Sequence, residues 1–298
     1  MTSGILAELV EPFERMPDAA AADLLGSDWG LSPIALDRLD TERDDTFRFE
    51  ADGASYVLKV AHPSDDPAVV DLQLAALAHA AEADPGLPLQ HVVPSRDGLA
   101  WVEVDGRAAR VYEWMDGTLA RGSEPTHRQL RAMGRMLGRL NLALRGFEHA
   151  ASRRELAWDL QRLPALRELA VDTPAMLEIV DRFEAETLPS LQRMPQQVIH
   201  NDFHPGNLLV DTSDEGYVTG ILDFGDVVHS ARVNDLGVAL AYLPMGSSPS
   251  EAALPFVDGF ESVVPLTPEE RAVLPHLVSA RLVQRRLLNA LLERANPN

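Results

Sequence analysis

The sequence predicts an α+β fold of two lobes, a strand-rich N-terminal lobe over residues 1–115 and a mainly helical C-terminal lobe over residues 116–298. Two patterns support this division. Before residue 115, short runs alternate apolar and polar residues, which is typical of strands. After Gly117, apolar residues recur at spacings of three and four, which is typical of amphipathic helices. A chain of 298 residues, 46% of them hydrophobic, is long enough to fill a core in each lobe.

The composition excludes several classes of protein. Asp and Glu number 46 against 26 Lys and Arg, and the formal net charge of -20 repels nucleic acid and anionic membranes. The chain has no cysteine, so disulfides and thiolate chemistry are excluded. The N-terminus does not resemble a signal peptide, and no apolar run reaches the roughly 18 residues that a membrane helix needs. We therefore expect a cytoplasmic protein without nucleic-acid or membrane partners.

Three helices are expected in the N-terminal lobe. The first two cover residues 5–16 and 19–25, and they should end at Pro17 and Gly26 respectively. The third covers residues 66–83, because its apolar residues recur on one face. The sequence thus predicts two helices before the first strand and one between the third and fourth strands.

The strands of the N-terminal lobe share alternating apolar residues and boundaries at turn-forming residues. They are expected at residues 34–39, 46–51, 55–61, 91–94, 99–104 and 107–114. The pairs Asp52-Gly53 and Asp105-Gly106 predict two-residue turns, since both residues tolerate the positive φ that such turns require. These turns indicate that the sheet is antiparallel.

The C-terminal lobe is expected to begin with a long helix over residues 124–147. Its apolar stripe consists of Leu130, Met133, Leu137, Leu140 and Leu144. A second helical stretch over residues 156–194 should break near Pro164 and Pro174. Three short strands are then expected at residues 197–199, 208–211 and 218–222, with a turn at Asp214-Glu215-Gly216. The chain should be helical from there to Arg294.

Polar residues interrupt an apolar segment at residues 198–211, VIHNDFHPGNLLVD. Burying so many polar groups is costly unless they are paired or bind a ligand. The stretch joins two expected strands, where a loop can present catalytic groups from a rigid scaffold. We therefore interpret it as a functional loop with the spacing His200-x-Asp202-x-x-x-x-Asn207.

A second acidic motif, Asp223-Phe224-Gly225, follows at the end of the next expected strand. The two motifs together match kinases, in which one Asp orients the attacking hydroxyl while an Asn and a second Asp bind Mg²⁺. Phosphoryl transfer needs such a set because negative charge spreads over the transferred group. Lys59, a lone charge in an apolar strand, is the expected cation for the α and β phosphates, although a lone strand lysine is more often a surface residue.

Three segments carry a resemblance to a known family: VIHNDFHPGNLLVD, GILDFGDVVHS and NDLGVALAYL. They resemble the aminoglycoside phosphotransferase and choline kinase group, small-molecule kinases with a protein-kinase-like fold. Within that group, the hydroxylysine kinases and the phosphotransferase part of aminotransferase fusions are the most similar. The resemblance covers about residues 32–243. It also implies that the chain could be fused to, or associate with, an aminotransferase.

The resemblance implies a role for each motif residue. Asp202 is expected to be the catalytic base, and Asn207 and Asp223 the ligands of Mg²⁺. Lys59 is expected to hold the phosphates of ATP or GTP, while the backbone of the segment from Glu113 to Met115 is expected to receive adenine.

The chain departs from the protein-kinase pattern at three places. The loop LDTERDDTF has no glycine, so phosphate contacts there must come from backbone amides or from Thr41 and Arg43. Gln73 stands where an acid usually pairs with the lysine, and we expect it to hydrogen-bond Lys59 instead. His204 replaces a lysine, and it either contacts the γ-phosphate or caps the loop.

The expected activity is phosphoryl transfer from ATP or GTP to a hydroxyl of a small amine-bearing molecule, such as a hydroxylated amino acid, an amino alcohol or an aminoglycoside. We expect this cationic acceptor to bind in an acidic cleft. The acids expected to line it are Asp226, Asp258, Glu261, Glu269 and Glu270. One alternative is a catalytically silent nucleotide-binding module. Another is a hydrolase or oxygenase whose transition metal is bound by His200, Asp202, His204 and His229.

Several polar residues near these motifs have simpler structural interpretations. His200 is expected to brace the loop through hydrogen bonds. Asp226 and Asp235 are expected to cap a turn and a helix N-terminus. The arginines of the C-terminal helix are expected to form a solvated face: Arg281, Arg285 and Arg286.

Overall fold

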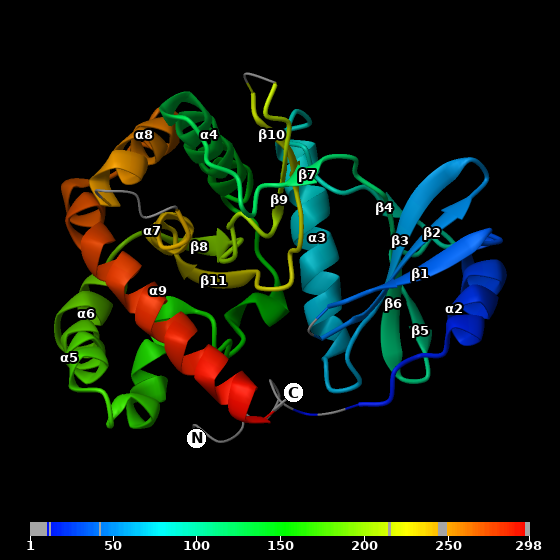
Figure 1. Cartoon of the computed structure of the whole chain (residues 1–298), viewed down its shortest axis with the longest axis horizontal. Coiled ribbons are helices and arrows are strands. Elements are labelled where there is room, and N and C mark those ends of the chain that lie inside the picture. The colour runs from blue at the N-terminus through cyan, green and yellow to red at the C-terminus, as the bar shows by residue number, and fades with distance from the viewer. Residues whose placement is uncertain (1–10, 12, 42, 214–215, 244–248, 296–298) are drawn as a thin grey trace.

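The computed structural model describes residue 11 and residues 13–41, 43–213, 216–243 and 249–295. The described chain forms a strand-rich lobe and a helical lobe, and the helix α3 (Pro67–Ala83) lies between the sheet and the helical lobe (Figure 1). The expected boundary after residue 115 falls between the last strand of the N-terminal sheet and the next element of the chain.

A six-stranded antiparallel sheet forms the N-terminal lobe. Its order is β1-β2-β3-β6-β4, with β5 paired to β6. The strands are β1 (Ala35–Leu39), β2 (Asp45–Ala51), β3 (Ala54–Val60), β4 (Val92–Val93), β5 (Val102–Val104) and β6 (Arg107–Glu113). Each expected strand is present within a few residues of its expected bounds. Both expected turns form, with positive φ at Asp52 (52°), Gly53 (80°), Asp105 (50°) and Gly106 (74°).

Two short helices pack beside this sheet before its first strand. They are α2 (Asp18–Leu24) and the π-helical turn η1 (Leu25–Trp29), and their buried side chains share a core with β2, β3 and β6. The expected helix over residues 5–16 lies largely outside the described residues, and residues 13–16 are not helical. The chain before α2 is instead fixed by hydrogen bonds to the sheet.

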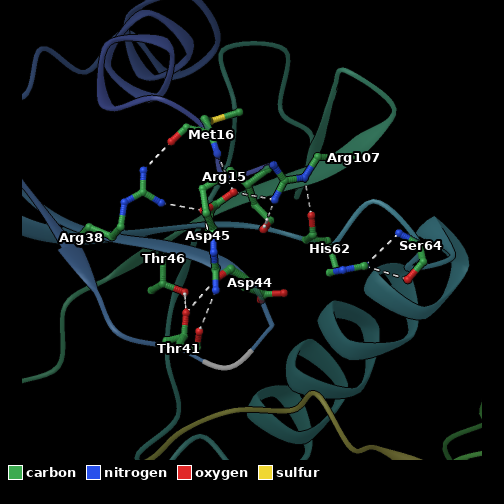
Figure 2. Close-up of polar contacts among 12 residues, drawn as sticks. Arg15, Met16, Arg38, Thr41, Asp44, Asp45, Thr46, His62, Ser64 and Arg107 are labelled. Atoms are coloured by element: carbon green, nitrogen blue, oxygen red, sulfur yellow. Dashed lines mark hydrogen bonds and ion pairs between the residues drawn. The ribbon is translucent and has the colours of Figure 1, made fainter. Parts of the chain in front are cut away.

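Asp45 fixes that N-terminal segment (Figure 2). Its side chain is fully buried and accepts hydrogen bonds from the Met16 backbone N–H (2.9 Å), Arg38 Nη1 (2.6 Å) and Arg107 Nη2 (2.8 Å). Burial by itself would raise the pKa of Asp45, but the hydrogen bonds and the neighbouring guanidinium groups outweigh burial and lower it below the ordinary value. The buried carboxylate is therefore ionised and joins three segments of the lobe.

Helix α3 belongs to the larger of two hydrophobic cores. Asp66 caps its N-terminus by accepting a hydrogen bond from Ala68 N–H at 2.9 Å. Buried residues of α3, such as Leu72, lie in one continuous core with the helices of the second lobe. The loop after α3 also bonds to that lobe, since the Ile221 N–H donates to the Pro88 carbonyl at 2.8 Å. The N-terminal lobe is thus tied to the strand that leads to the second acidic motif.

The C-terminal lobe contains helices and two small sheets. Its helices are α4 (His127–Ala143), η2 (Ala150–Arg153), η3 (Leu160–Ala170), α5 (Pro174–Arg182), η4 (Phe183–Thr187), α6 (Leu188–Leu191), α7 (Val233–Leu240), α8 (Pro249–Glu261) and α9 (Pro268–Ala295). Its strands are β7 (Thr118–Leu119), β8 (Gln196–Ile199), β9 (Leu208–Val210), β10 (Val218–Ile221) and β11 (Val228–Ala231). β7 extends the β9-β10 hairpin, and β11 pairs with β8.

The expectations for this lobe differ from the structure at β7, at β11, which lies in the stretch expected to be helical, and at Pro164. β7 and β11 were not expected, because each is short and binds a partner distant in sequence. Pro164 does not end a helix but lies inside the 3-10 helix η3, whereas Pro174 begins α5. Within the described residues, no helix is both long and apolar enough to cross a membrane.

Candidate active site

Asp235, which lies in the first turn of α7, holds the loop between β8 and β9. The Asp235 carboxylate is fully buried and accepts hydrogen bonds from the Asn201 N–H at 2.7 Å and the His200 N–H at 3.4 Å. His200 in turn accepts a hydrogen bond from the Asp202 N–H at Nδ1 (3.3 Å). Burial lowers the pKa of His200, which keeps it neutral. His200 thus braces the loop as expected, and Asp235 is an anchor of the loop rather than a simple helix cap.

The side chain of Asp202 is held by two neighbours. Asn207 Nδ2 donates to Oδ2 of Asp202 at 2.7 Å, and Arg281 Nη2 donates to Oδ1 at 3.3 Å. His204 Nε2 lies 3.4 Å from the same Oδ2. The carboxylate nevertheless keeps 22% of its surface exposed. It is therefore oriented by the protein and still open to a ligand.

The pairing of β9 with β10 brings Asn207 close to the second motif. Leu208 pairs with Ile221, and the Leu222 N–H donates to the Asn207 carbonyl at 2.8 Å, one residue before Asp223. The backbone of Asp223 has φ = 61°, a left-handed conformation that is sparsely populated outside glycine and often marks functional sites. The first motif and the end of the next strand therefore converge, as the sequence predicted.

The side-chain oxygen atoms of Asn207 and Asp223 suit Mg²⁺, which prefers oxygen ligands. The Asn207 amide nitrogen donates to Asp202, so its carbonyl oxygen is left to accept. Asp223 Oδ1 accepts one hydrogen bond, from the Gly225 N–H at 2.9 Å, and the side chain is 47% exposed. Both residues could hold the metal ion.

Lys59 reaches this site from β3 of the other lobe. Its Nζ lies 3.5 Å from Asp223 Oδ2. The Lys59 ammonium lowers the pKa of Asp223 to about 2. Burial alone would lower the pKa of Lys59, but the carboxylates of Asp223 and Asp44 outweigh it and raise the pKa. Both partners are therefore charged at neutral pH.

The expected hydrogen bond between Gln73 and Lys59 was wrong. In the described structure, Gln73 Oε1 instead accepts from Arg110 Nη2 at 3.3 Å. Arg110 lies directly across from Lys59 in the β3-β6 pairing, and its Nη2 also donates to Asp44 at 2.9 Å. A second buried cation thus occupies the region where an acid was expected, and Gln73 binds that cation.

Side chains of the loop before β2 already bond to other groups of the protein, as Figure 2 shows for Thr41. The Thr41 hydroxyl donates to the Asp44 carbonyl at 2.7 Å and lies 3.1 Å from the Thr46 hydroxyl. Arg43 forms an ion pair with Asp65, with Nε 2.9 Å from Oδ1. Any phosphate contact from either side chain would require these bonds to be exchanged, so backbone amides remain the other expected source.

The segment after β6 keeps its backbone partly available. The Glu113 N–H donates to the His91 carbonyl and the Trp114 N–H to the Ser55 carbonyl, both at 2.9 Å. Within the described residues, no backbone hydrogen bond involves Met115. Met115 can therefore offer its backbone to a base, whereas the N–H groups of Glu113 and Trp114 are already used.

The C-terminal helix contributes to the site, which contradicts the expectation of a solvated face. Arg281 is 1% exposed, and its Nη1 donates to the Trp158 carbonyl at 2.7 Å. It was misassigned although Leu277, Gln284 and Leu288 mark a buried stripe at helical spacing around it. Only Arg286 of the three arginines is classed as exposed.

The expected acidic cleft was also wrong for most of its members. Three of the five expected acids form ion pairs with arginines: Asp258 with Arg131, Glu261 with Arg271, and the fully buried Glu270 with Arg232. Asp226 is the member that interacts with Asp202. Burial and the Asp202 carboxylate raise the pKa of Asp226 to about 7.

The transition-metal alternative finds no support in the side-chain geometry. In the part of the chain that the structure describes, no three His, Cys, Asp or Glu side chains converge as a metal site. His204 accepts a hydrogen bond from the Gly206 N–H at Nδ1 (2.9 Å), while His229 Nδ1 lies 3.5 Å from Arg153. The four proposed ligands therefore do not form one site.

The site combines a lysine from a strand-rich lobe with an Asp-Phe-Gly carboxylate and an Asp-Asn loop on a helical lobe. This combination defines a phosphotransferase with a protein-kinase-like fold. Comparison with known families agrees with this class. Residues 38–282 match the phosphotransferase enzyme family, and the chain belongs to that family. The protein is a small-molecule kinase.

Curated relatives and solved structures are similar over most of the chain. Hydroxylysine kinase of Mus musculus is 27% identical over 90% of this chain and 80% of its own length. Homoserine kinase of Methylobacillus flagellatus is 27% identical over 76% and 70%, respectively. A microcompartment-associated aminopropanol kinase superposes with a TM-score of 0.68 at 21% identity, over 93% of this chain and 94% of that one. Spectinomycin phosphotransferase, solved with ADP and spectinomycin, gives 0.65 at 13% identity, over 97% and 91%. These structures confirm the two-lobe fold.

Proposed function

We propose that the protein transfers the γ-phosphoryl group of ATP or GTP, with Mg²⁺, to a hydroxyl of a small amine-bearing molecule. The observation that carries the proposal is the meeting of three groups. Asn207 donates to Asp202 at 2.7 Å, and Lys59 from the other lobe lies 3.5 Å from Asp223. These contacts support the assignment of Asn207 and Asp223 as a metal-binding pair, Lys59 as the phosphate cation and Asp202 as the base, the set that phosphoryl transfer requires.

The nucleotide would bind between the lobes with its phosphates at Lys59. Asn207 and Asp223 would hold Mg²⁺, which supplies charge neutralisation on the phosphate oxygens. Arg110 adds a second positive charge next to Lys59, and this supports phosphate binding in a site whose loop lacks glycine. The adenine or guanine ring of the nucleotide would bind the backbone near Met115.

Asp202 would orient the acceptor hydroxyl and accept its proton. Its two oxygen atoms are fixed by Asn207 and Arg281, so the carboxylate needs little reorganisation during the reaction. His204, which stacks on Tyr242 with ring centres 4.6 Å apart, would border the acceptor. Its Nδ1 accepts from Gly206, which supports the loop-capping role over direct phosphate contact.

The amine preference rests on one acid rather than on an acidic cleft. Asp226 interacts with Asp202 and has no hydrogen-bonded cation among the described residues. An acceptor ammonium placed there would favour the ionised form of Asp226 and gain a charge-assisted hydrogen bond to it. Relatives named for hydroxylysine, homoserine and aminopropanol, each a molecule with an amine and a hydroxyl, support the same choice. Association with an aminotransferase remains a prediction.

A phosphoryl-transfer screen tests the proposal. ATP and GTP are each offered with amino alcohols, hydroxylated amino acids and aminoglycosides, with and without Mg²⁺. We expect Mg²⁺-dependent turnover of at least one amine-bearing alcohol and a lower kcat/KM for its N-acetylated form. Nucleotide binding without turnover of any acceptor would favour the silent module, and equal rates for amine and N-acetyl forms would contradict the amine preference.

A further inference from the structure

The charges around Asp202 are not all paired within the protein. Asp202 itself interacts with Arg281 at 3.3 Å. Two ionisable side chains in the same region form no ion pair among the described residues: the acid Asp226, on which Arg154 and Arg281 act only at longer range, and the guanidinium of Arg285. A ligand with both charges would complement them.

Arg285 is linked to the catalytic loop by two independent routes. It follows Arg281 by four residues on α9, so both side chains lie on one face of the helix, about 6 Å apart along its axis. Its guanidinium also lies 4.8 Å from the centre of the Tyr242 ring, and His204 stacks on that same ring. Arg285 is therefore a neighbour of the groups that surround Asp202.

The environment of Arg285 differs from that of a surface arginine. Its side chain is half-buried against an aromatic ring, which fixes the guanidinium plane, whereas the adjacent Arg286 is exposed. A fixed guanidinium without a carboxylate partner is suited to bidentate binding of a carboxylate from a ligand. The face of α9 that contacts the catalytic base thus offers an anion-binding group.

We propose that Arg285 binds a carboxylate of the acceptor and that the acceptor is a hydroxylated amino acid. Its ammonium would lie at Asp226 and its hydroxyl at Asp202. This inference rests on the proposed function and narrows its substrate class, since amino alcohols and aminoglycosides lack the carboxylate.

The test uses pairs of acceptors that differ only in the carboxylate. Homoserine is compared with 3-aminopropan-1-ol, and hydroxylysine with 1,5-diaminopentan-2-ol. The values of kcat/KM are measured for the wild type, Arg285→Gln, Arg285→Lys and the matched control Arg286→Gln, after thermal melting has shown that each variant is folded.

We expect Arg285→Gln to lower kcat/KM at least about tenfold for the preferred amino acid, as the loss of a charge-assisted hydrogen bond predicts. The decarboxylated partner should be unaffected, Arg285→Lys should retain part of the activity, and Arg286→Gln should match the wild type. Equal losses on both members of a pair would mean that Arg285 only positions Tyr242, and this would overturn the inference. A raised KM for the nucleotide alone, or no loss on any acceptor, would overturn it as well.

Binding separates failure of this inference from failure of the proposed function. If the wild type phosphorylates none of the four acceptors, calorimetry measures homoserine and hydroxylysine binding to the nucleotide-bound protein. Binding that Arg285→Gln weakens and Arg286→Gln preserves would support the carboxylate site even without turnover. No binding of either amino acid to the wild type would overturn it.

Discussion

At the scale of single residues, the site depends on side chains that support the motif residues Asp202, Asn207 and Asp223. Asp235 anchors the loop through the backbone of His200 and Asn201, and Arg281 holds Asp202. The criterion that selected Lys59, a lone charge in an apolar strand, would not have found Arg110, because β6 also contains Arg107 and Glu113. Its partner Asp44 could not have been found either, because the two are 66 residues apart in sequence.

Replacing the proposed base should separate catalysis from nucleotide binding. We expect Asp202→Ala to lower kcat by about 10²- to 10⁴-fold, the usual contribution of a general base, and to leave the Kd for nucleotide within about twofold. The reason is that a base acts on the acceptor in the transition state, whereas Lys59 and Asp223 also act on the bound nucleotide. Rapid-quench kinetics and nucleotide titration measure the two quantities, and near-normal turnover by the variant would remove Asp202 from this role.

At the scale of elements, α4 and α8 pack with their backbones in near contact. A Cβ added at Gly134 would lie 1.9 Å from the Phe256 carbonyl oxygen, and one added at Gly259 would lie 2.0 Å from the Arg131 carbonyl oxygen. Neither carbonyl can move aside as a flexible side chain could. The leucine stripe of α4 predicted a buried face, but not that two helices meet there through glycine.

A single added methyl group should therefore destabilise this helix pair. We expect Gly134→Ala to lower the free energy of unfolding by about 1–3 kcal/mol or more, because the helices must separate. Gly26→Ala is the matched control, since a Cβ there meets nothing within 4 Å. It should be neutral or slightly stabilising. Urea unfolding compares the two variants, and equal stability would show that α4 and α8 tolerate separation.

The buried carboxylate of Asp45 joins the N-terminal segment to β1, β2 and β6, and it should make stability depend on acid. Its pKa in the folded state is lowered, so its contribution is complete above the unfolded value of about 3.9 and is lost as pH falls through the lower folded pKa. Asp45→Asn should remove this acid-dependent part. It should also destabilise at neutral pH by about 3–5 kcal/mol, because Arg107 would remain buried without its charge partner.

Unfolding by urea at several pH values between 2 and 7 measures this effect. The exposed Glu103 on β5 supplies a control, and Glu103→Gln should leave the profile almost unchanged. If Asp45→Asn and the wild type lost stability in parallel below pH 4, other carboxylates would account for the acid sensitivity.

At the scale of the whole molecule, Lys59 and Asp223 form an ion pair between the lobes, so bound nucleotide should stabilise the complete fold. At 100 times its Kd, a ligand that binds only the folded state adds about 2.7 kcal/mol. We expect Mg²⁺ with ATP or GTP to raise Tm, and Lys59→Met to abolish most of the rise. Scanning calorimetry with each nucleotide also decides between ATP and GTP, and an unchanged Tm with both would contradict the proposed cofactor.

The sequence by itself determined the strands and the two turns of the N-terminal sheet, the long helix α4 and the two motifs around Asp202 and Asp223. These features are local, because turn residues, apolar spacing and a loop motif act within a few positions of the chain. The convergence of Asn207 with Asp223 was also predictable, since they lie at adjacent strand ends.

Only the tertiary structure decided which charges meet. The sequence placed Gln73 beside Lys59, Arg281 in solvent and five acids in one cleft, whereas folding gave Gln73 to Arg110, buried Arg281 under Asp202 and paired three of the acids with arginines. A charged side chain can reach any partner that packing brings within a few ångströms, and a buried charge must find one. Because that partner is often many residues away, the spacing of charges along the chain does not determine their pairing.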